Sequence, residues 1–290
     1  EAIKILGMFV PKGTEVVSTK GRTEDSRQVY RTSSEPILPD LPLAVLINGN
    51  SASASEIVTG ALQDLDRAVV IGQRSYGKGL VQSPRPLGYN AMLKLTTAKY
   101  YIPSGRCIQK PYVKGEKEKY NEDLNTRFTH GELMHLDSIH LDSTKVYTTL
   151  EKHRTVYGGG GIMPDIFVPL DTTSYTPYYR ALSRNNLITQ AALRFTDSNR
   201  KPILRRYKSF DDYLTSYAIP TSLLDDIEKE AEKKGIKPKD EAERKEARED
   251  MAFMLKALVA YNVWDRNEYF RIINQKNDIV KRALEELQKP

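Results

Sequence analysis

The chain has 290 residues, of which 39% are hydrophobic and 28% are charged, and its formal net charge is +6. This length and composition suit a folded protein of about two domains. Every apolar run is far shorter than the ~20 residues of a membrane-spanning helix, and the single cysteine, Cys107, excludes an internal disulfide. Charges of both signs alternate between residues 225 and 250, as on solvent-exposed helices, so we expect no nucleic-acid binding.

The first residues are typical of the end of an amphipathic helix. Apolar residues recur at helical spacing from Glu1 to Val10, and Pro11-Lys12-Gly13 then stops the helix. Because Glu1 is not a methionine and the start of this helix is missing, we expect the chain to be part of a longer protein. Residues 14–19 and 27–32 alternate apolar and polar side chains, which predicts two strands.

The segment from Leu43 to Glu56 predicts a strand, a turn and the start of a helix. Residues 43–47 form an apolar run of the kind found in the buried strands of parallel sheets, and Asn48-Gly49-Asn50 favours a turn. Ser53 and Glu56 have the spacing of a capping box. At such a junction the Ser53 hydroxyl can face a cleft, and the free N–H groups of the first turn point at negative charge. A plain N-cap is the alternative role of Ser53, and spacing alone does not exclude Ser51 or Ser55.

A second buried strand is predicted over residues 68–72, and a turn at residues 76–79 leads into a third strand. Lys78 stands between two glycines, which allow a tight bend and the close approach of other groups. A lysine that folds into a desolvated pocket has a lowered pKa, and its neutral amine can accept a proton from a serine hydroxyl. Gln82 follows on the same face of the extended segment and could orient this amine. The alternative is a solvated Lys78 between two ordinary turn glycines.

Residues 92–102 predict a long strand that could border a substrate cleft. The polar, tyrosine-containing segment 110–157 follows. It holds His130, His135, His140 and His153, whose spacing suits neither a helical metal pair nor a zinc module. We therefore expect no metal and no cofactor.

After Leu170 the pattern becomes helical. Helices are predicted over residues 178–196 and 209–218, from Pro220 to about residue 234, and over residues 239–263 and 264–288. The apolar stripes of the last two need partners, either each other and the core or a second copy in a homodimer. We therefore divide the chain into residues 1–170 and a helical C-terminal domain of residues 171–290.

Several motifs in the first 170 residues occur in the order found in one protein family. They are Leu46–Asn48, Ser51–Val58, Gly60–Asp64, Tyr76–Gln82, Gly105–Gln109 and Gly159–Asp165. Together they resemble the carboxy-terminal processing proteases, also called tail-specific proteases. An ordered series of this kind is far more specific than one short pattern. Segment 110–157 is then an insertion between two of the motifs.

The resemblance implies an α/β fold with a ClpP/crotonase-like protease core. In that family a serine and a lysine form the catalytic dyad and a glutamine four residues after the lysine supports it; these are Ser53, Lys78 and Gln82 here. The backbone N–H of Ala54 would be one oxyanion donor. Some members support the dyad from the position of Asp64, which also suits a helix C-terminus. Members carry a glycine-rich segment and a PDZ domain upstream, both absent from these 290 residues.

We accordingly expect a serine endopeptidase that cleaves proteins at or near accessible C-termini. The resemblance points to the bacterial cell envelope, with a periplasmic location and peripheral association as expectations. The alternative is a catalytically incomplete fragment or pseudoprotease that binds peptides or proteins.

Overall fold

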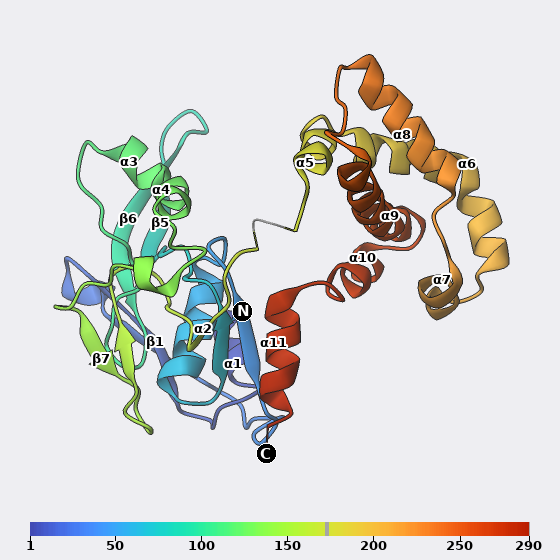
Figure 1. Cartoon of the computed structure of the whole chain (residues 1–290). Helices are drawn as coiled ribbons and strands as arrows, with labels where there is room; N and C mark the ends of the chain where they lie inside the picture. The colour runs from blue at the N-terminus through green and yellow to red at the C-terminus, as the bar shows by residue number, and fades with distance from the viewer. Residues whose placement is uncertain (172–173, 290) are drawn as a thin grey trace. The chain divides into compact units, whose positions relative to one another are not determined.

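The computed structural model describes residues 1–171 and 174–289 (Figure 1). These residues form two compact units, one of residues 1–170 together with 282–290 and one of residues 171–281. The mixed helix-and-sheet class and the C-terminal helical region are confirmed. The division into domains at residue 170 stays a prediction.

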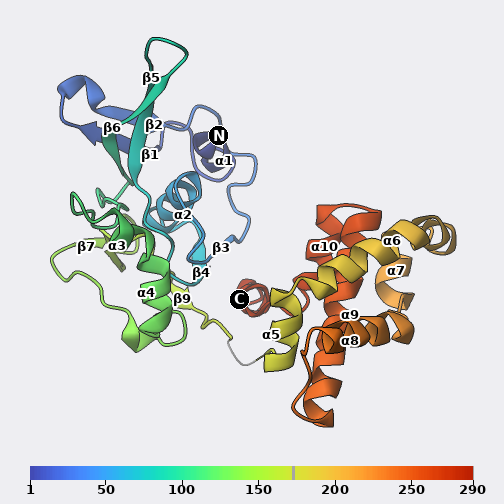
Figure 2. The same cartoon turned by 90° about the horizontal axis from the view of Figure 1, so that it is seen from above.

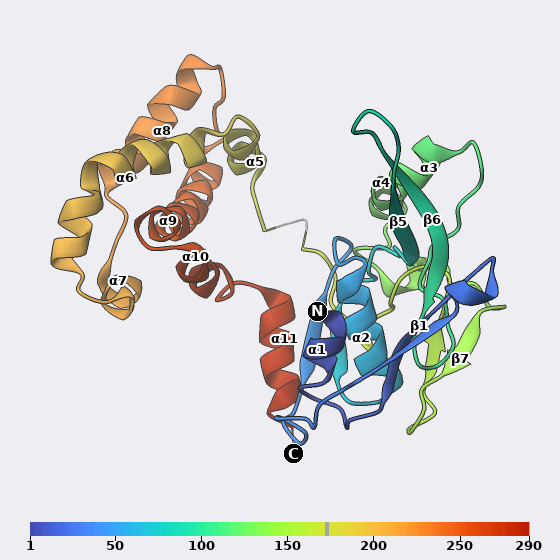
Figure 3. The same cartoon turned by 180° about the vertical axis from the view of Figure 1, so that it is seen from behind.

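The first unit contains a four-stranded antiparallel sheet and a three-stranded parallel sheet. The antiparallel order is β2 (Gln28–Arg31), β1 (Glu15–Gly21), β6 (Met92–Tyr101) and β5 (Leu80–Pro86). The parallel order is β3 (Ala44–Ile47), β4 (Val69–Gly72) and β9 (Ile166–Phe167). Strands β7 (Val146–Thr148) and β8 (Thr155–Tyr157) form a separate pair. Figure 3 shows β5 and β6 as a long hairpin.

Helix α2 (Ala54–Asp64) is the central helix of this unit (Figure 2). Its apolar face, with Ile57 and Leu62, packs against Leu6 at the end of α1 (Ala2–Leu6) and against Val17 of β1. Each such fully buried aliphatic side chain stabilises the fold by about 1.5–3 kcal/mol. The insertion adds α3 (Lys117–Asn121), α4 (Asp123–Thr129) and a 3₁₀ turn, Leu136–Ser138, and a further 3₁₀ turn spans Glu24–Ser26. The packing of α2 fixes the direction of its N-terminal end, where Ser53 lies.

One expectation about this unit is wrong. Residues 43–47 were predicted to form a buried strand, but Leu46 is 40% exposed and Val45 is half-buried, which leaves Ile47 as the buried residue of β3. The reason is that β3 stands at the edge of its sheet, where β4 is its one neighbouring strand among residues 1–171 and 174–289. An apolar run predicts the capacity to be buried, whereas actual burial depends on what the other face and edge contact.

The second unit is helical. Its helices are α5 (Pro177–Arg184), α6 (Leu187–Arg206), α7 (Phe210–Ser216), α8 (Thr221–Lys233), α9 (Glu241–Val263) and α10 (Arg266–Ile273). Helix α9 packs against α5, α6, α8 and α10. Its Met251 and Leu255 belong to one buried cluster, and its Val259 and Val263 belong to a second. Among the residues described here, no helix is both long and apolar enough to span a bilayer.

Two predicted helices are each divided in the structure. The predicted helix 178–196 breaks where Asn186 adopts a left-handed conformation (φ 58°), which a short polar side chain tolerates. The predicted helix 264–288 breaks at Asn274–Asn277, and α11 (Asp278–Leu287) follows. Apolar periodicity continued across both breaks, so the pattern alone did not reveal them.

A buried polar network holds the C-terminal end of α2. Asp64 Oδ1 lies 2.8 Å from Arg106 Nη2, and both side chains are fully buried. Arg106 also donates to Gln63 Oε1 (2.7 Å) and to the carbonyl of Tyr157 (2.9 Å). Burial lowers the pKa of Arg106, and the Asp64 carboxylate opposes this shift. Gln63 in turn donates to Asp165 Oδ1 (2.8 Å), so three of the sequence motifs meet in one network.

Replacing Arg106→Met should lower the free energy of unfolding by about 3–5 kcal/mol, because the Asp64 carboxylate then stays buried without its cation. Urea denaturation measures this change. The matched control is Lys229→Met, since the Lys229–Asp226 pair is exposed and should contribute less than about 1 kcal/mol. Equal, small effects of both substitutions would contradict a structural role for the buried pair.

Candidate active site

Ser53 occupies a strained position at the N-terminal end of α2. As the N-cap it has φ 58° and ψ −116°, and it is half-buried. A residue with a side chain rarely adopts positive φ, and such strain persists where the surroundings hold it in place. A strained serine at a strand-to-helix junction is also the arrangement that exposes the nucleophile in α/β-hydrolases. The predicted junction of β3 and α2 at Ser53 is confirmed.

The buried carboxylate of Glu56 holds Ser53 and the Lys78 loop together. Oε2 accepts from the backbone N–H of Ser53 (2.9 Å) and from that of Lys78 (2.8 Å). Oε1 accepts from the backbone N–H of Gly77 (2.7 Å) and from the Ser75 hydroxyl. All four partners are donors, which suits a carboxylate that can only accept. The sequence indicated the contact with Ser53 through the capping box, but the contacts with the loop were missed.

The loop 75–79 is also tied to the glycine-rich segment before β9. The Ser75 hydroxyl accepts from the backbone N–H of Ile162 (2.6 Å), so it links this segment to Glu56. Gly77 has φ 89°, and a Cβ there would lie 3.1 Å from the backbone nitrogen of Gly161. A larger residue at position 77 would therefore separate the two segments.

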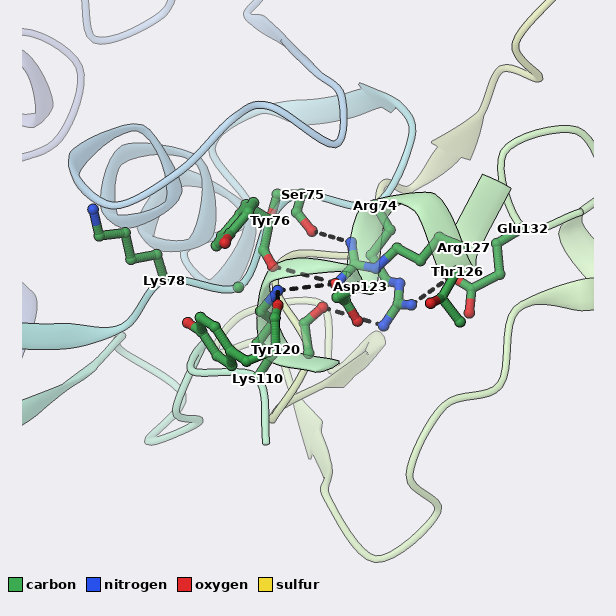
Figure 4. Close-up of polar contacts among 12 residues, drawn as sticks. Arg74, Ser75, Tyr76, Lys78, Lys110, Tyr120, Asp123, Thr126, Arg127 and Glu132 are labelled. Carbon is green, nitrogen blue, oxygen red and sulfur yellow. Dashed lines mark hydrogen bonds and ion pairs between the residues drawn. The ribbon is translucent and has the colours of Figure 1, made fainter. Parts of the chain in front are cut away.

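The glycines beside Lys78 allow the backbone, rather than the lysine side chain, to pack inward. A Cβ on Gly79 would lie 2.7 Å from the Gln109 nitrogen, and the Gly79 N–H donates to Gln109 Oε1 (2.8 Å). The Lys78 side chain is exposed, and Figure 4 shows it extending away from the polar cluster. No hydrogen bond joins it to Ser53 within residues 1–171 and 174–289. The expectation of an inward, desolvated Lys78 is therefore not met in this structure; the groups that pack inward beside it are the backbone atoms of Gly77 and Gly79.

The other serines and Ala54 differ in what their polar groups contact. The Ser51 hydroxyl accepts from the Asn48 N–H (3.1 Å), and the Ser51 carbonyl accepts from the Tyr76 N–H (2.9 Å). Ser51 therefore stabilises the turn after β3 and links it to the Lys78 loop. Ser55 is exposed as the second residue of α2. Ala54 is exposed as well, and in the described part of the chain its N–H takes part in no hydrogen bond. A free donor beside Ser53 is what an oxyanion site requires.

Gln82 and Asp64 lie in different places. Gln82 is exposed on β5 and lines a cleft together with Lys78 and Leu80, which agrees with the predicted shared face. Asp64 is the last residue of the 11-residue helix α2, roughly 16 Å along the axis from Ser53 at 1.5 Å per residue. Its carboxylate pairs with Arg106 and does not reach the Lys78 loop.

The insertion braces the Lys78 loop from the other side (Figure 4). Arg127 of α4 is 3% exposed and donates to the carbonyls of Ser75 (2.7 Å) and Tyr76 (3.3 Å). Burial lowers the pKa of Arg127, and the nearby cation Arg74 lowers it further. Asp123 lies 2.9 Å from Arg127 Nη2, which partly balances this buried charge. One sequence gives no signal for this contact, because nothing in the composition of the insertion indicates which basic residue is buried.

Lys110 is the second buried cation of the insertion. Its amine lies 4.2 Å from the centroids of the Tyr76 and Tyr120 rings and 3.1 Å from Asp123 Oδ2. Burial lowers the pKa of Lys110, whereas Asp123 opposes the shift. No group of three or more potential metal ligands occurs among the described residues, the four histidines included. Lys110 and Arg127 therefore serve to fasten the insertion to the loop before Lys78.

Residues 1–117 match the model of peptidase family S41, and residues 178–265 match a family of unknown function (DUF8443). The chain is 51% identical over 109 residues to a carboxy-terminal-processing protease of Bartonella bacilliformis, an alignment that covers 38% of this chain and 25% of that protein. It is 38% identical over 130 residues to a probable CtpA-like serine protease of Staphylococcus aureus strain N315, covering 43% and 26%.

The chain spans about a quarter of the length of these two relatives. Among solved structures, the photosystem II D1 C-terminal processing protease is similar at 22% identity with a TM-score of 0.38, over 58% of this chain and 30% of that one. The residues matched by the family model, 1–117, include the strained Ser53 and the Lys78 loop. Residues 1–117 of this chain therefore match peptidase family S41, and their resemblance to the carboxy-terminal processing proteases is confirmed.

Proposed function

We propose that the protein is a serine endopeptidase that cleaves other proteins at or near their C-termini with a Ser53/Lys78 dyad. The observation that carries the proposal is the shared oxygen of Glu56. Because Oε2 accepts from Ser53 N at 2.9 Å and from Lys78 N at 2.8 Å, the two nitrogens are at most 5.7 Å apart. The Lys78 amine stands on a flexible four-carbon stem, and the proposed reaction requires this stem to turn from its exposed position toward the Ser53 hydroxyl.

The proposed reaction proceeds in two stages. Ser53 Oγ bonds to the peptide carbonyl carbon while the neutral Lys78 amine takes its proton. The C–N bond then breaks, and Lys78 delivers the proton to the leaving amine. Water attacks the acyl-enzyme, again with Lys78 as the base, and the serine is restored. Gln82 orients Lys78, and the free N–H of Ala54 is one donor to the oxyanion.

The wider expectations belong to this proposal. A ClpP/crotonase-like core is supported by the parallel β3-β4-β9 sheet with α2 following β3. Asp64 would support the dyad indirectly, because its buried ion pair with Arg106 holds the C-terminal end of α2. Bacterial relatives support a location in the cell envelope. The proposal further includes a periplasmic location, peripheral association with the envelope, protein substrates with accessible C-termini and a homodimer through the C-terminal helices.

The exposure of Lys78 is the observation that favours the alternative, a catalytically incomplete chain that binds peptides. In that alternative the Lys78 side chain stays exposed to solvent and does not meet the Ser53 hydroxyl. The two functions differ in turnover, which the following substitutions measure.

In the full-length protein, Ser53→Ala and Lys78→Ala should each lower kcat/KM by about 10⁴-fold or more, because each removes a member of the unit that forms the acyl-enzyme. Mass spectrometry of a protein substrate measures the loss of its C-terminal segment. Lys94→Ala is the matched control, since Lys94 is exposed on β6 and lies outside the cleft. Undiminished cleavage by both dyad variants would reject the dyad.

The isosteric change Glu56→Gln should lower kcat by about 10- to 100-fold with little change in KM. An amide NH₂ would meet an N–H donor at either oxygen position, so the loop and the helix end would move apart. Ser75→Ala is the comparison, because it removes one donor to Glu56 and the acceptor of the Ile162 N–H but leaves the three backbone bonds to Glu56. Steady-state kinetics on the folded variants measures both constants. An unchanged kcat in Glu56→Gln would show that the hydrogen bonds to the Glu56 carboxylate do not position the dyad.

A further inference from the structure

A cleft of about 850 Å³ lies beside the Lys78 loop, within the size range of ligand sites. Strands β5 and β6 form one wall, and the insertion forms the other with α3, β7 and the segment before α3. The lining residues are Lys78, Leu80, Gln82, Thr96, Lys99, Tyr101, Cys107, Gln109, Lys110, Pro111, Tyr112, Lys117, Tyr120, Asn121, Lys145, Tyr147 and Gly159. The insertion thus shapes this site.

The charged groups of this cleft are all of one sign. Five lysines and no aspartate or glutamate occur among the described residues that line it. Lys110 is held by Asp123, and Lys145 pairs with Asp142. The other three, Lys78, Lys99 and Lys117, form no ion pair within the described ranges. A concave surface with one sign of charge concentrates counter-ions and strengthens their binding.

The remaining lining groups suit a peptide. Four tyrosines, Tyr101, Tyr112, Tyr120 and Tyr147, provide hydroxyl donors and flat apolar area. Strand β5, which contributes Leu80 and Gln82, is the edge of its sheet in the described structure, so its outer N–H and C=O groups are open to an added strand. Strand addition recognises the backbone of an extended peptide, and side-chain pockets then select the sequence.

We propose that this cleft binds an acidic segment of a peptide substrate, with the peptide extended along β5 and its Asp or Glu carboxylates at Lys99, at Lys117 and, in exchange for the exposed Asp142 partner, at Lys145. The inference rests on the proposed peptidase function and names the side-chain chemistry that it selects. Two of these lysines come from the insertion, so the insertion acts as the specificity-determining wall.

Cys107, the single cysteine of the chain, lines the cleft and serves as a reporter. Its rate of alkylation by iodoacetamide, a neutral reagent, is measured with and without peptide in the 290-residue chain carrying Ser53→Ala. The probe is an unstructured peptide rich in Glu, and the comparison peptide has every Glu replaced by Gln. The readout is the ratio of the two rates for each variant. Burial raises the pKa of the Cys107 thiol and the charges of Lys99 and Lys145 oppose this rise, so removing them changes the alkylation rate even without peptide.

The Glu peptide should protect Cys107, and the Gln peptide should require an at least tenfold higher concentration for equal protection. Lys99→Gln/Lys145→Gln should weaken protection by the Glu peptide by about threefold to tenfold. The control variant Lys94→Gln/Lys114→Gln removes the same charge from exposed positions on β6 and the insertion that do not line the cleft, and it should keep wild-type protection.

Equal protection by the two peptides, or equal loss in the two double variants, would overturn the proposal. Stronger protection by a single-stranded oligonucleotide than by the Glu peptide would overturn it as well, since the cleft would then select another polyanion. Binding is read without hydrolysis, so this result is independent of whether the Ser53/Lys78 dyad cleaves peptides.

Discussion

The arrangement of the candidate site depends on one buried carboxylate, that of Glu56. It joins the N-terminal end of α2 to a loop more than twenty residues away by accepting hydrogen bonds from Ser53, Ser75, Gly77 and Lys78. Burying a carboxylate costs several kcal/mol unless its lone pairs are satisfied. Four donors on two oxygens satisfy them. The bond from the Ser53 N–H to Glu56 also helps to hold Ser53 in its positive-φ conformation. The strained backbone of Ser53 and the attachment of the Lys78 loop to α2 therefore depend on the same carboxylate.

The rest of the unit keeps this carboxylate enclosed and its donors in place. Gly77 and Gly79 allow the loop backbone to approach Gly161 and Gln109 closely. Arg127 holds the carbonyls of the same loop from the side of the insertion. At the far end of α2, the Asp64–Arg106 pair fixes the helix against the segments around residues 106 and 157. The insertion is therefore both a brace for the loop and one wall of the cationic cleft.

The sequence predicted much of the local structure and less of the tertiary structure. The strand, turn and helix around Ser53 followed from an apolar run and a capping box, because these signals act between neighbours in the chain. The helices around Asn186 and Asn274 were joined incorrectly, because apolar spacing continues through a short break. The exposure of Leu46 depends on the edge position of β3, which no local pattern encodes.

In the candidate site, too, the sequence predicted the local features and missed the contacts between distant segments. Ser53, Lys78 and Gln82 were proposed from motifs in order, and the structure places Ser53 and the Lys78 backbone on one carboxylate. The inward orientation of the Lys78 side chain was predicted from the glycines on either side of it. Glycine permits close packing, but the backbone and not the Lys78 side chain packs inward here. Arg127, Lys99 and Lys145 were missed, since their roles arise from contacts between β6, the insertion and the loop.

The most direct test of the central claim is amide hydrogen exchange at Ser53, Gly77 and Lys78, measured residue by residue by NMR in the wild type and in Glu56→Ala. We expect these three amides to be protected in the wild type and to exchange at least about tenfold faster in the variant, while core amides of α9 such as that of Val259 keep their rates. If the three amides exchange as fast in the wild type as in Glu56→Ala, the Glu56 carboxylate does not hold the site together.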